Sequence, residues 1–67
     1  MDIEVVYHVF ADDKDDWFTD FGRALLRYRR FKKKYGNARL YIEIYSDREN
    51  DVLIYENCLL AVGAFPL

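Results

Sequence analysis

Cysteine, glycine and proline are scarce in this chain of 67 residues, which holds one Cys, three Gly and one Pro. A single cysteine excludes the intramolecular disulfide framework of many small secreted domains. So few Gly and Pro residues are also atypical of disordered segments and linkers. The sequence shows no charged-then-apolar leader and no apolar run long enough to cross a membrane. These absences predict a cytoplasmic protein without a membrane partner.

Hydrophobic residues make up 52% of the chain and aromatic residues 18%. Large aromatic side chains bury much area per residue, which matters because this length is near the lower limit for a self-sufficient core. We find no internal repeat and no composition shift that would mark a boundary. The sequence therefore predicts a single domain over residues 1–67.

Residues 16–35 have the pattern of one amphipathic helix of about five turns. Helical spacing places eight apolar residues on one core-facing side: Trp17, Phe18, Phe21, Ala24, Leu25, Tyr28, Phe31 and Tyr35. Asp13, Asp15 or Asp16 is the expected N-cap, because a carboxylate there accepts from free backbone N–H groups. Gly36 is expected to end the helix in the left-handed conformation.

Strands are predicted at residues 2–10 and 38–45 and in the apolar stretch 52–65, which forms either one strand or two joined at Glu56-Asn57. Neither face of 52–65 is consistently polar, so we expect it in the middle of the sheet. The order β-α-β-β predicts an α+β fold. Its expected form is a split β-α-β, half-ferredoxin-like domain with one helix on a three- or four-stranded mixed sheet.

One helix covers only one face of such a sheet. The other face is expected to present Tyr41 and Tyr45, because residues 38–45 alternate between aliphatic and polar-aromatic side chains. An uncovered, aromatic-rich face usually marks an interface. We therefore expect this face to join two copies as a homodimer or to contact another partner.

Charge is strongly segregated although the net charge is only −2. Residues 1–20 carry −6, residues 23–39 carry +8 and residues 40–67 carry −4. Part of this polarity complements the helix dipole, since acids precede the helix and bases end it. The bases are also concentrated enough to attract an acidic partner or to neutralise phosphates.

Catalytic and metal-binding patterns are missing. His8 and Cys58 are the only histidine and cysteine, and Cys58 lies in an apolar stretch where an inert buried thiol is expected. The acids around Asp13 and those around Asp47 both lack the Gly and Glu positions of a calcium loop. No zinc spacing or phosphate-binding Gly loop is present. We predict no enzymatic activity, no metal and no cofactor.

The sequence thus favours a protein that works by contact. We expect a small non-catalytic module, such as an inhibitor, adaptor or accessory protein of a phage or other mobile element. Its expected partner is a larger protein with an acidic surface. The alternative is a nucleic-acid-binding module that uses the basic helix 23–34, and a third interpretation is that this face is only solvated. The expected partner-binding residues are Arg23, Leu26, Arg27, Arg30, Lys33, Lys34, Tyr41 and Tyr45.

Overall fold

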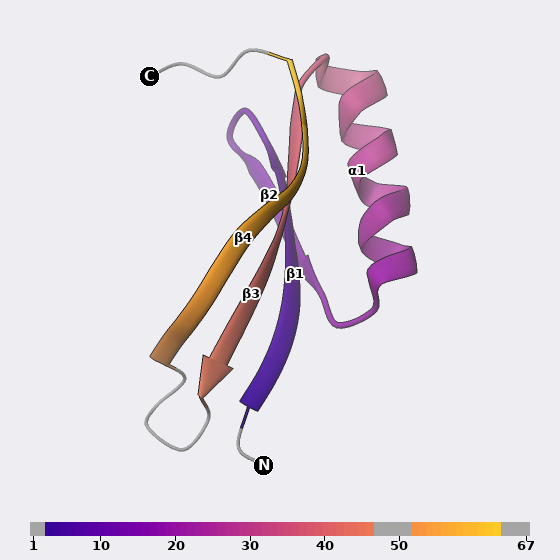
Figure 1. Cartoon of the computed structure of the whole chain (residues 1–67). Helices are drawn as coiled ribbons and strands as arrows, with labels where there is room; N and C mark the ends of the chain where they lie inside the picture. Colours follow the sequence, from indigo (N-terminus) through magenta and orange to yellow (C-terminus); the bar gives the residue numbers. More distant parts are fainter. Residues whose placement is uncertain (1–2, 47–51, 64–67) are drawn as a thin grey trace.

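The protein has one helix packed on one side of a four-stranded antiparallel sheet (Figure 1). This is a computed structural model, and it describes residues 3–46 and 52–63. The elements are β1 (Ile3–Ala11), β2 (Lys14–Phe18), α1 (Phe21–Tyr35), β3 (Ala38–Ser46) and β4 (Val52–Val62). The sheet order is β2-β1-β3-β4. The predicted small α+β class, with one helix on the sheet, is confirmed.

The segment before the helix is a strand, and the prediction that the helix begins at Asp16 was wrong. β2 pairs antiparallel with β1, with Ala11 opposite Lys14 across a tight turn. Asp12 has φ 52° in this turn, a left-handed conformation that Asp tolerates better than most residues. Backbone pairing with β1 satisfies this segment in the extended form, and this tertiary pairing outweighs its helical apolar spacing.

The helix proper follows the local rules. Asp20, rather than an earlier Asp, is the N-cap, and its side chain accepts a 2.9 Å hydrogen bond from the backbone N–H of Arg23. Gly36 ends the helix as predicted, with φ 78° and its N–H donating to the Lys32 carbonyl at 3.0 Å. Ala24 and Phe31 lie on the buried side that packs on the sheet.

The strand order corrects the predicted mixed, half-ferredoxin-like sheet. β1 and β3 were expected to be parallel, but they are adjacent and antiparallel. The cause is the β1–β2 hairpin, which reverses the chain before the helix begins. Because β2 and β3 both run antiparallel to β1, they are parallel to each other, and α1 connects them across β1.

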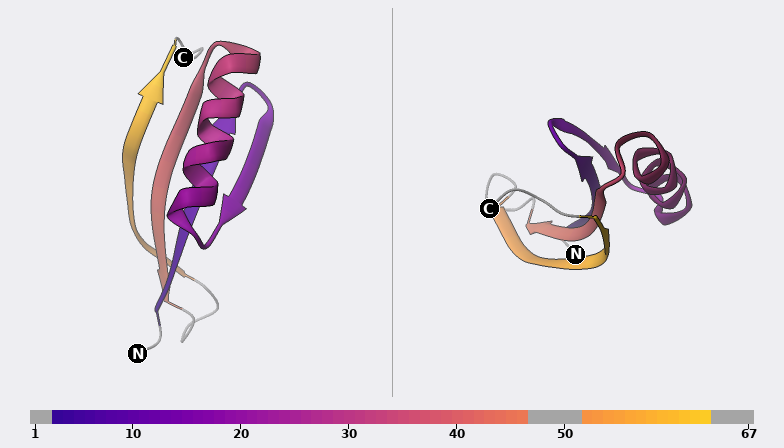
Figure 2. Two further views of the ribbon diagram at one scale, coloured as in Figure 1. Left: turned by 90° about the vertical axis from the view of Figure 1, so that its right-hand side faces the viewer. Right: turned by 90° about the horizontal axis from the view of Figure 1, so that it is seen from above.

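β4 is a single strand, with no turn at Glu56-Asn57, and it lies at the edge of the sheet. The predicted central position was therefore wrong. Its ladder with β3 is interrupted twice, because Ile54 and Leu59 have no partner in the register. These two bulges bend the strand, which helps to give the sheet its strong curvature (Figure 2).

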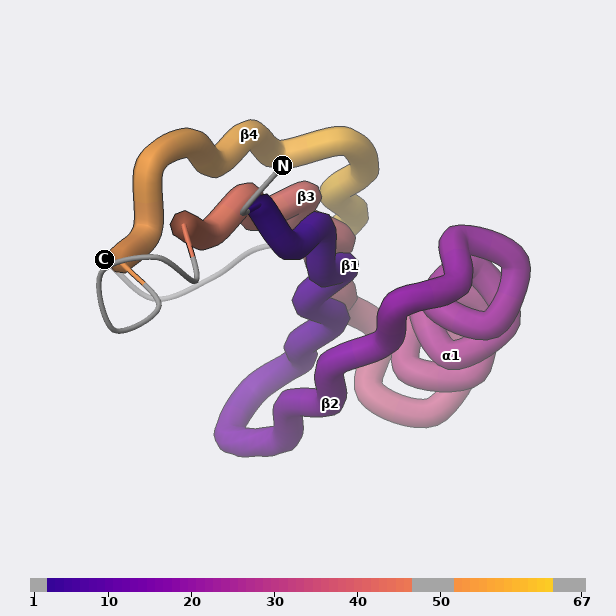
Figure 3. The backbone as a smooth tube through the Cα atoms, turned by 90° about the horizontal axis from the view of Figure 1, so that it is seen from below, coloured from indigo at the N-terminus to yellow at the C-terminus, as the bar shows by residue number. Residues whose placement is uncertain are grey.

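The core lies between α1 and the adjacent parts of β1 and β3. Its buried members are Val9, Ala11, Ala24, Tyr28, Phe31, Ala38 and Leu40. α1 packs chiefly on β1, β3 and β2, whereas the contacts of β4 are chiefly with β3. The ends of β1, β3 and β4 farthest from the core extend past the helix, as Figure 1 shows, and Figure 3 shows β4 on the side of β3 away from β1. One edge of the sheet is therefore left without a helical cover.

Candidate functional site

A groove runs between β2 and α1. Its lining consists of Phe18, Arg23, Leu26, Arg27 and Arg30, and its volume is about 300 Å³. We call these five residues the β2–α1 groove. The four helical members recur at spacings of one and two turns, so they form one stripe on the side of α1 that faces β2. The groove thus combines the aromatic ring of Phe18, the exposed side chain of Leu26 and three guanidinium groups.

Arg27 is held in place at this groove. Its Nη1 donates to Asp16 Oδ2 on β2. Its guanidinium also lies 5.6 Å from the ring centroid of Phe18 and 5.8 Å from that of Phe31, within cation–π range. Because Asp16 neutralises it, Arg27 fixes the shape of the groove more than it contributes free charge.

Leu26 stands at the outer side of the groove with 66% of its surface exposed. Arg23 and Arg30 are also exposed, one turn on either side of it. Lys33 and Lys34 continue the same stripe in the last turn, where Lys34 Nζ lies 5.5 Å from the Tyr35 ring centroid. The structure therefore brings together all six helical residues that the sequence predicted.

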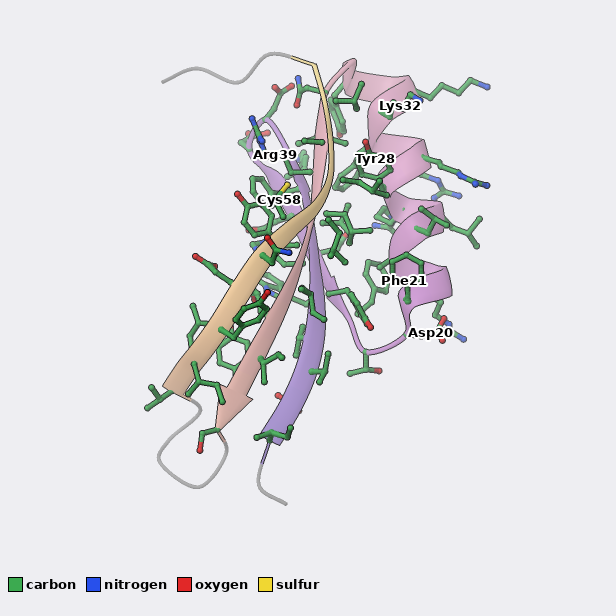
Figure 4. The ribbon with its side chains drawn as sticks, viewed as in Figure 1. Asp20, Phe21, Tyr28, Lys32, Arg39 and Cys58 are labelled. Carbon is green, nitrogen blue, oxygen red and sulfur yellow. The ribbon has the colours of Figure 1, made fainter. Side chains whose placement is uncertain are left out.

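Tyr41 and Tyr45 do not belong to this surface. The residues paired in the register share a face, and these two lie with His8 and Glu43 on the side of the sheet opposite α1, here called the open face. Figure 4 shows Arg39 and Cys58 projecting from the same side of the sheet, away from the helix. The predicted binding residues therefore form two separate surfaces.

Aromatic side chains cross the open face from β2 to β3. Trp17 stacks on His8 with ring centroids 4.3 Å apart, and His8 lies 4.9 Å from Phe10. Phe10 in turn lies 5.5 Å from Tyr41. These rings form a continuous series of contacts across three strands, so each ring packs against the next.

Glu43 is the polar centre of the open face and is only 7% exposed. His8 Nδ1 lies 3.0 Å from its Oε2, and the Tyr45 hydroxyl donates to its Oε1 at 2.7 Å. That hydrogen bond, together with burial and the nearby carboxylates of Glu4 and Glu56, raises the pKa of Tyr45 to about 12. The open face is thus acidic as well as aromatic.

The only histidine and the only cysteine are not positioned as a base and a nucleophile. Both are on the open face, but Tyr41 lies between them in the register, opposite His8 on one side and Cys58 on the other. Two strand spacings correspond to roughly 10 Å, well beyond hydrogen-bond reach. The Cys58 thiol instead contacts the Leu60 carbonyl at 3.5 Å.

The first acidic cluster is used for local structure. Asp12 pairs with Asn37, whose side-chain N–H donates to it at 3.0 Å, and Asp16 holds Arg27. Within residues 3–46 and 52–63, no group of three or more potential ligands is placed to hold a metal ion. The second cluster, Asp47, Glu49 and Asp51, lies outside the described residues.

Sequence reasoning missed three parts of these surfaces. It assigned Phe18 and Trp17 to the helix core, whereas they lie on β2 at the groove and on the open face. It also did not single out Glu43, which is only 7% exposed at the centre of the open face. The signal for β2 is the alternation of Asp16 and Phe18 against Asp15 and Trp17, which matches a two-residue period.

No helix among the described residues has the length and apolar character needed to span a membrane. Comparison of the chain with protein-family models, with curated proteins and with solved structures finds no match.

Proposed function

We propose that this protein is a non-catalytic binding module that docks an acidic segment of a larger protein in the β2–α1 groove. The observation that carries the proposal is the composition of the groove, where Leu26 and Phe18 lie among three guanidinium groups. Binding patches commonly combine an apolar anchor with surrounding charge. Arginine also pairs with carboxylates in a bidentate geometry.

The groove favours a partner segment with one apolar side chain flanked by carboxylates. The apolar side chain enters beside Leu26 and the Phe18 ring, which removes their exposed surface from water. Carboxylates on either side reach Arg23 and Arg30, which lie one turn before and after Leu26. Since Arg27 is already paired with Asp16, its position needs no reordering when a partner binds.

Nucleic acid is the second candidate, because one side of α1 carries five bases, Arg23, Arg27, Arg30, Lys33 and Lys34. Modules that stack bases combine aromatic rings and positive charge on one surface. Here Tyr41 and Tyr45 are on the open face, beside the carboxylates of Glu4, Glu43 and Glu56. Those acids repel phosphates, so the tyrosines do not assist a nucleic acid bound at α1. This separation favours the protein partner.

The test is capture of partners from source-cell lysate, with and without nuclease, by wild type, Leu26→Asp and Arg30→Ala. Arg29→Ala is the matched control, because Arg29 is an exposed arginine of α1 outside the groove. We expect Leu26→Asp to weaken capture at least as much as Arg30→Ala, and Arg29→Ala to have little effect. Nuclease should leave the captured protein unchanged.

Binding of arbitrary single-stranded and duplex oligonucleotides is measured in parallel at several salt concentrations. A nucleic-acid module would show a steep salt slope that falls by about one for Arg30→Ala, with no effect of Leu26→Asp. That result would replace the first proposal with the second. If neither Leu26→Asp nor Arg30→Ala weakens capture any more than the control Arg29→Ala does, this side of the helix has no binding role.

A further inference from the structure

The outer edge of β4 is unpaired in the part of the chain that the structure describes, since β4 is the last strand in the order β2-β1-β3-β4. β4 is eleven residues long, so it presents a long row of backbone donors and acceptors. It holds no Lys and no Pro, and its only charged residue is Glu56. Natural edge strands usually carry such residues because they discourage pairing with another chain.

The side chains of β4 are also unusually exposed. Six large hydrophobic residues of this strand are between 37% and 55% exposed: Val52, Leu53, Ile54, Tyr55, Leu59 and Leu60. They gain little cover from α1, whose main contacts are with the other three strands. Exposed apolar side chains concentrated on one edge strand of a small protein indicate an interface.

The sequence of β4 is complementary to itself when it is reversed. Its apolar arms, VLIY and LLAV, flank the polar centre Glu56-Asn57-Cys58. We propose that a second copy of this chain pairs antiparallel with β4, about a two-fold axis at Asn57, so that the two sheets join into one of eight strands. The partner is thus this protein itself, and this interface is independent of the β2–α1 groove.

Centring on Asn57 pairs all eleven residues. Apolar residues then oppose apolar residues, as Val52 with Val62, Leu53 with Ala61, Ile54 with Leu60 and Tyr55 with Leu59. Glu56 opposes Cys58 of the other copy. A two-fold axis at Glu56 would instead place the two carboxylates directly opposite each other, which is destabilising. An axis at Cys58 leaves Val52 and Leu53 without partners.

The bulges of β4 fit this arrangement. The segment Tyr55–Cys58 between Ile54 and Leu59 keeps a regular register with β3, and Asn57 lies within it. Pairing between copies therefore begins at a regular stretch and extends outward through the bent arms. Ile54 is 55% and Leu59 41% exposed, so substitution of either side chain removes little packing within one copy.

The test is sedimentation equilibrium of the full chain over a range of micromolar concentrations. We expect a dimer, and we expect Ile54→Lys and Leu59→Lys each to raise its dissociation constant at least about tenfold, which corresponds to about 1.4 kcal/mol. Leu26→Lys is the control: it places the same charge at another exposed apolar residue, on α1, and should leave the dimer intact. A wild-type monomer throughout, or a dimer that tolerates both β4 lysines, would overturn the proposal.

Two further measurements make the result specific. Tyr41→Lys with Tyr45→Lys should leave this dimer in place, and its loss in that variant alone would assign the interface to the open face instead.

Cys58 is the only cysteine, so any thiol cross-link joins two copies. The Asn57 axis places the two Cys58 residues diagonally at about 7–8 Å, suited to a short bismaleimide. A disulfide that forms rapidly without the cross-linker would overturn this register.

Discussion

Replacing Glu43 by Gln tests the polar cluster of the open face. The Tyr45 hydroxyl donates to Glu43 at 2.7 Å, and this acceptor is the main reason that the pKa of Tyr45 is raised from 10.0 to about 12. Glu43→Gln replaces a charged acceptor by a neutral amide and removes its repulsion of a tyrosinate. We expect the pKa of Tyr45 to fall toward 10.0 in this variant.

The same shift sets a pH dependence of stability. The folded protein holds the Tyr45 proton more tightly than the unfolded chain does. The resulting contribution of Tyr45 to the free energy of unfolding is therefore complete below pH 10 and is lost as the pH rises to about 12. A difference of about two in pKa corresponds to at most about 3 kcal/mol, which solvent screening at this partly exposed side chain reduces to about 1 kcal/mol. Stability therefore falls as Tyr45 loses its proton.

The measurement is a spectrophotometric titration of tyrosinate for wild type, Glu43→Gln and Tyr45→Phe. Subtracting the Tyr45→Phe curve isolates this residue from the other five tyrosines. Urea unfolding at pH 10 and at about pH 12 then gives the change in the free energy of unfolding between these two pH values. This change should be smaller in both variants than in wild type. A wild-type Tyr45 that titrates near 10.0, or a Glu43→Gln variant with an unchanged titration, would refute the reasoning.

Two further predictions concern helix ends and glycines, and both are measured as the free energy of unfolding in urea. Asp20→Ala should destabilise the fold by about 1 kcal/mol, because the N–H of Arg23 loses its acceptor, whereas Asp13→Ala should have little effect. Gly36→Ala should cost about 1–2 kcal/mol, the usual cost of a left-handed residue. Gly63→Ala should cost more than Gly36→Ala, because φ is +82° there and an added Cβ would lie 2.8 Å from Asn37 Cβ. Equal costs for the two glycines would show that this contact relaxes.

The sequence predicted the helix and its buried side because the apolar period is unambiguous from Phe21 to Tyr35. It also placed Leu40 toward the helix and Tyr41 away from it, since a strict two-residue alternation leaves no other choice. It failed at Asp16–Phe18, where the same residues fit a helical and an extended period. Only the pairing with β1, a contact distant along the chain, selects the strand.

The arrangement of the predicted binding residues follows from the sequence within single elements, but their contacts between elements do not. The stripe from Arg23 to Lys34 follows from helical spacing alone. Its separation from Tyr41 follows from the alternation of residues 38–45, which places Tyr41 on the face away from the helix. Local sequence does not encode the contact of this stripe with β2, because Phe18 fits the helical period as well. The position of β4 was missed for a related reason. Apolar composition favours a strand that is covered on both faces, but it does not distinguish a central strand from an edge strand.

The order of the strands also has a consequence for folding kinetics. β1 with β2 and β3 with β4 pair neighbours along the chain, but β1 and β3 join residues as far apart as Ile3 and Ser46. Closing that long loop costs chain entropy before any contact compensates for it, so β1–β3 docking is the expected slow step. Truncating Val9 or Leu40, which face each other across this pair, should therefore slow folding.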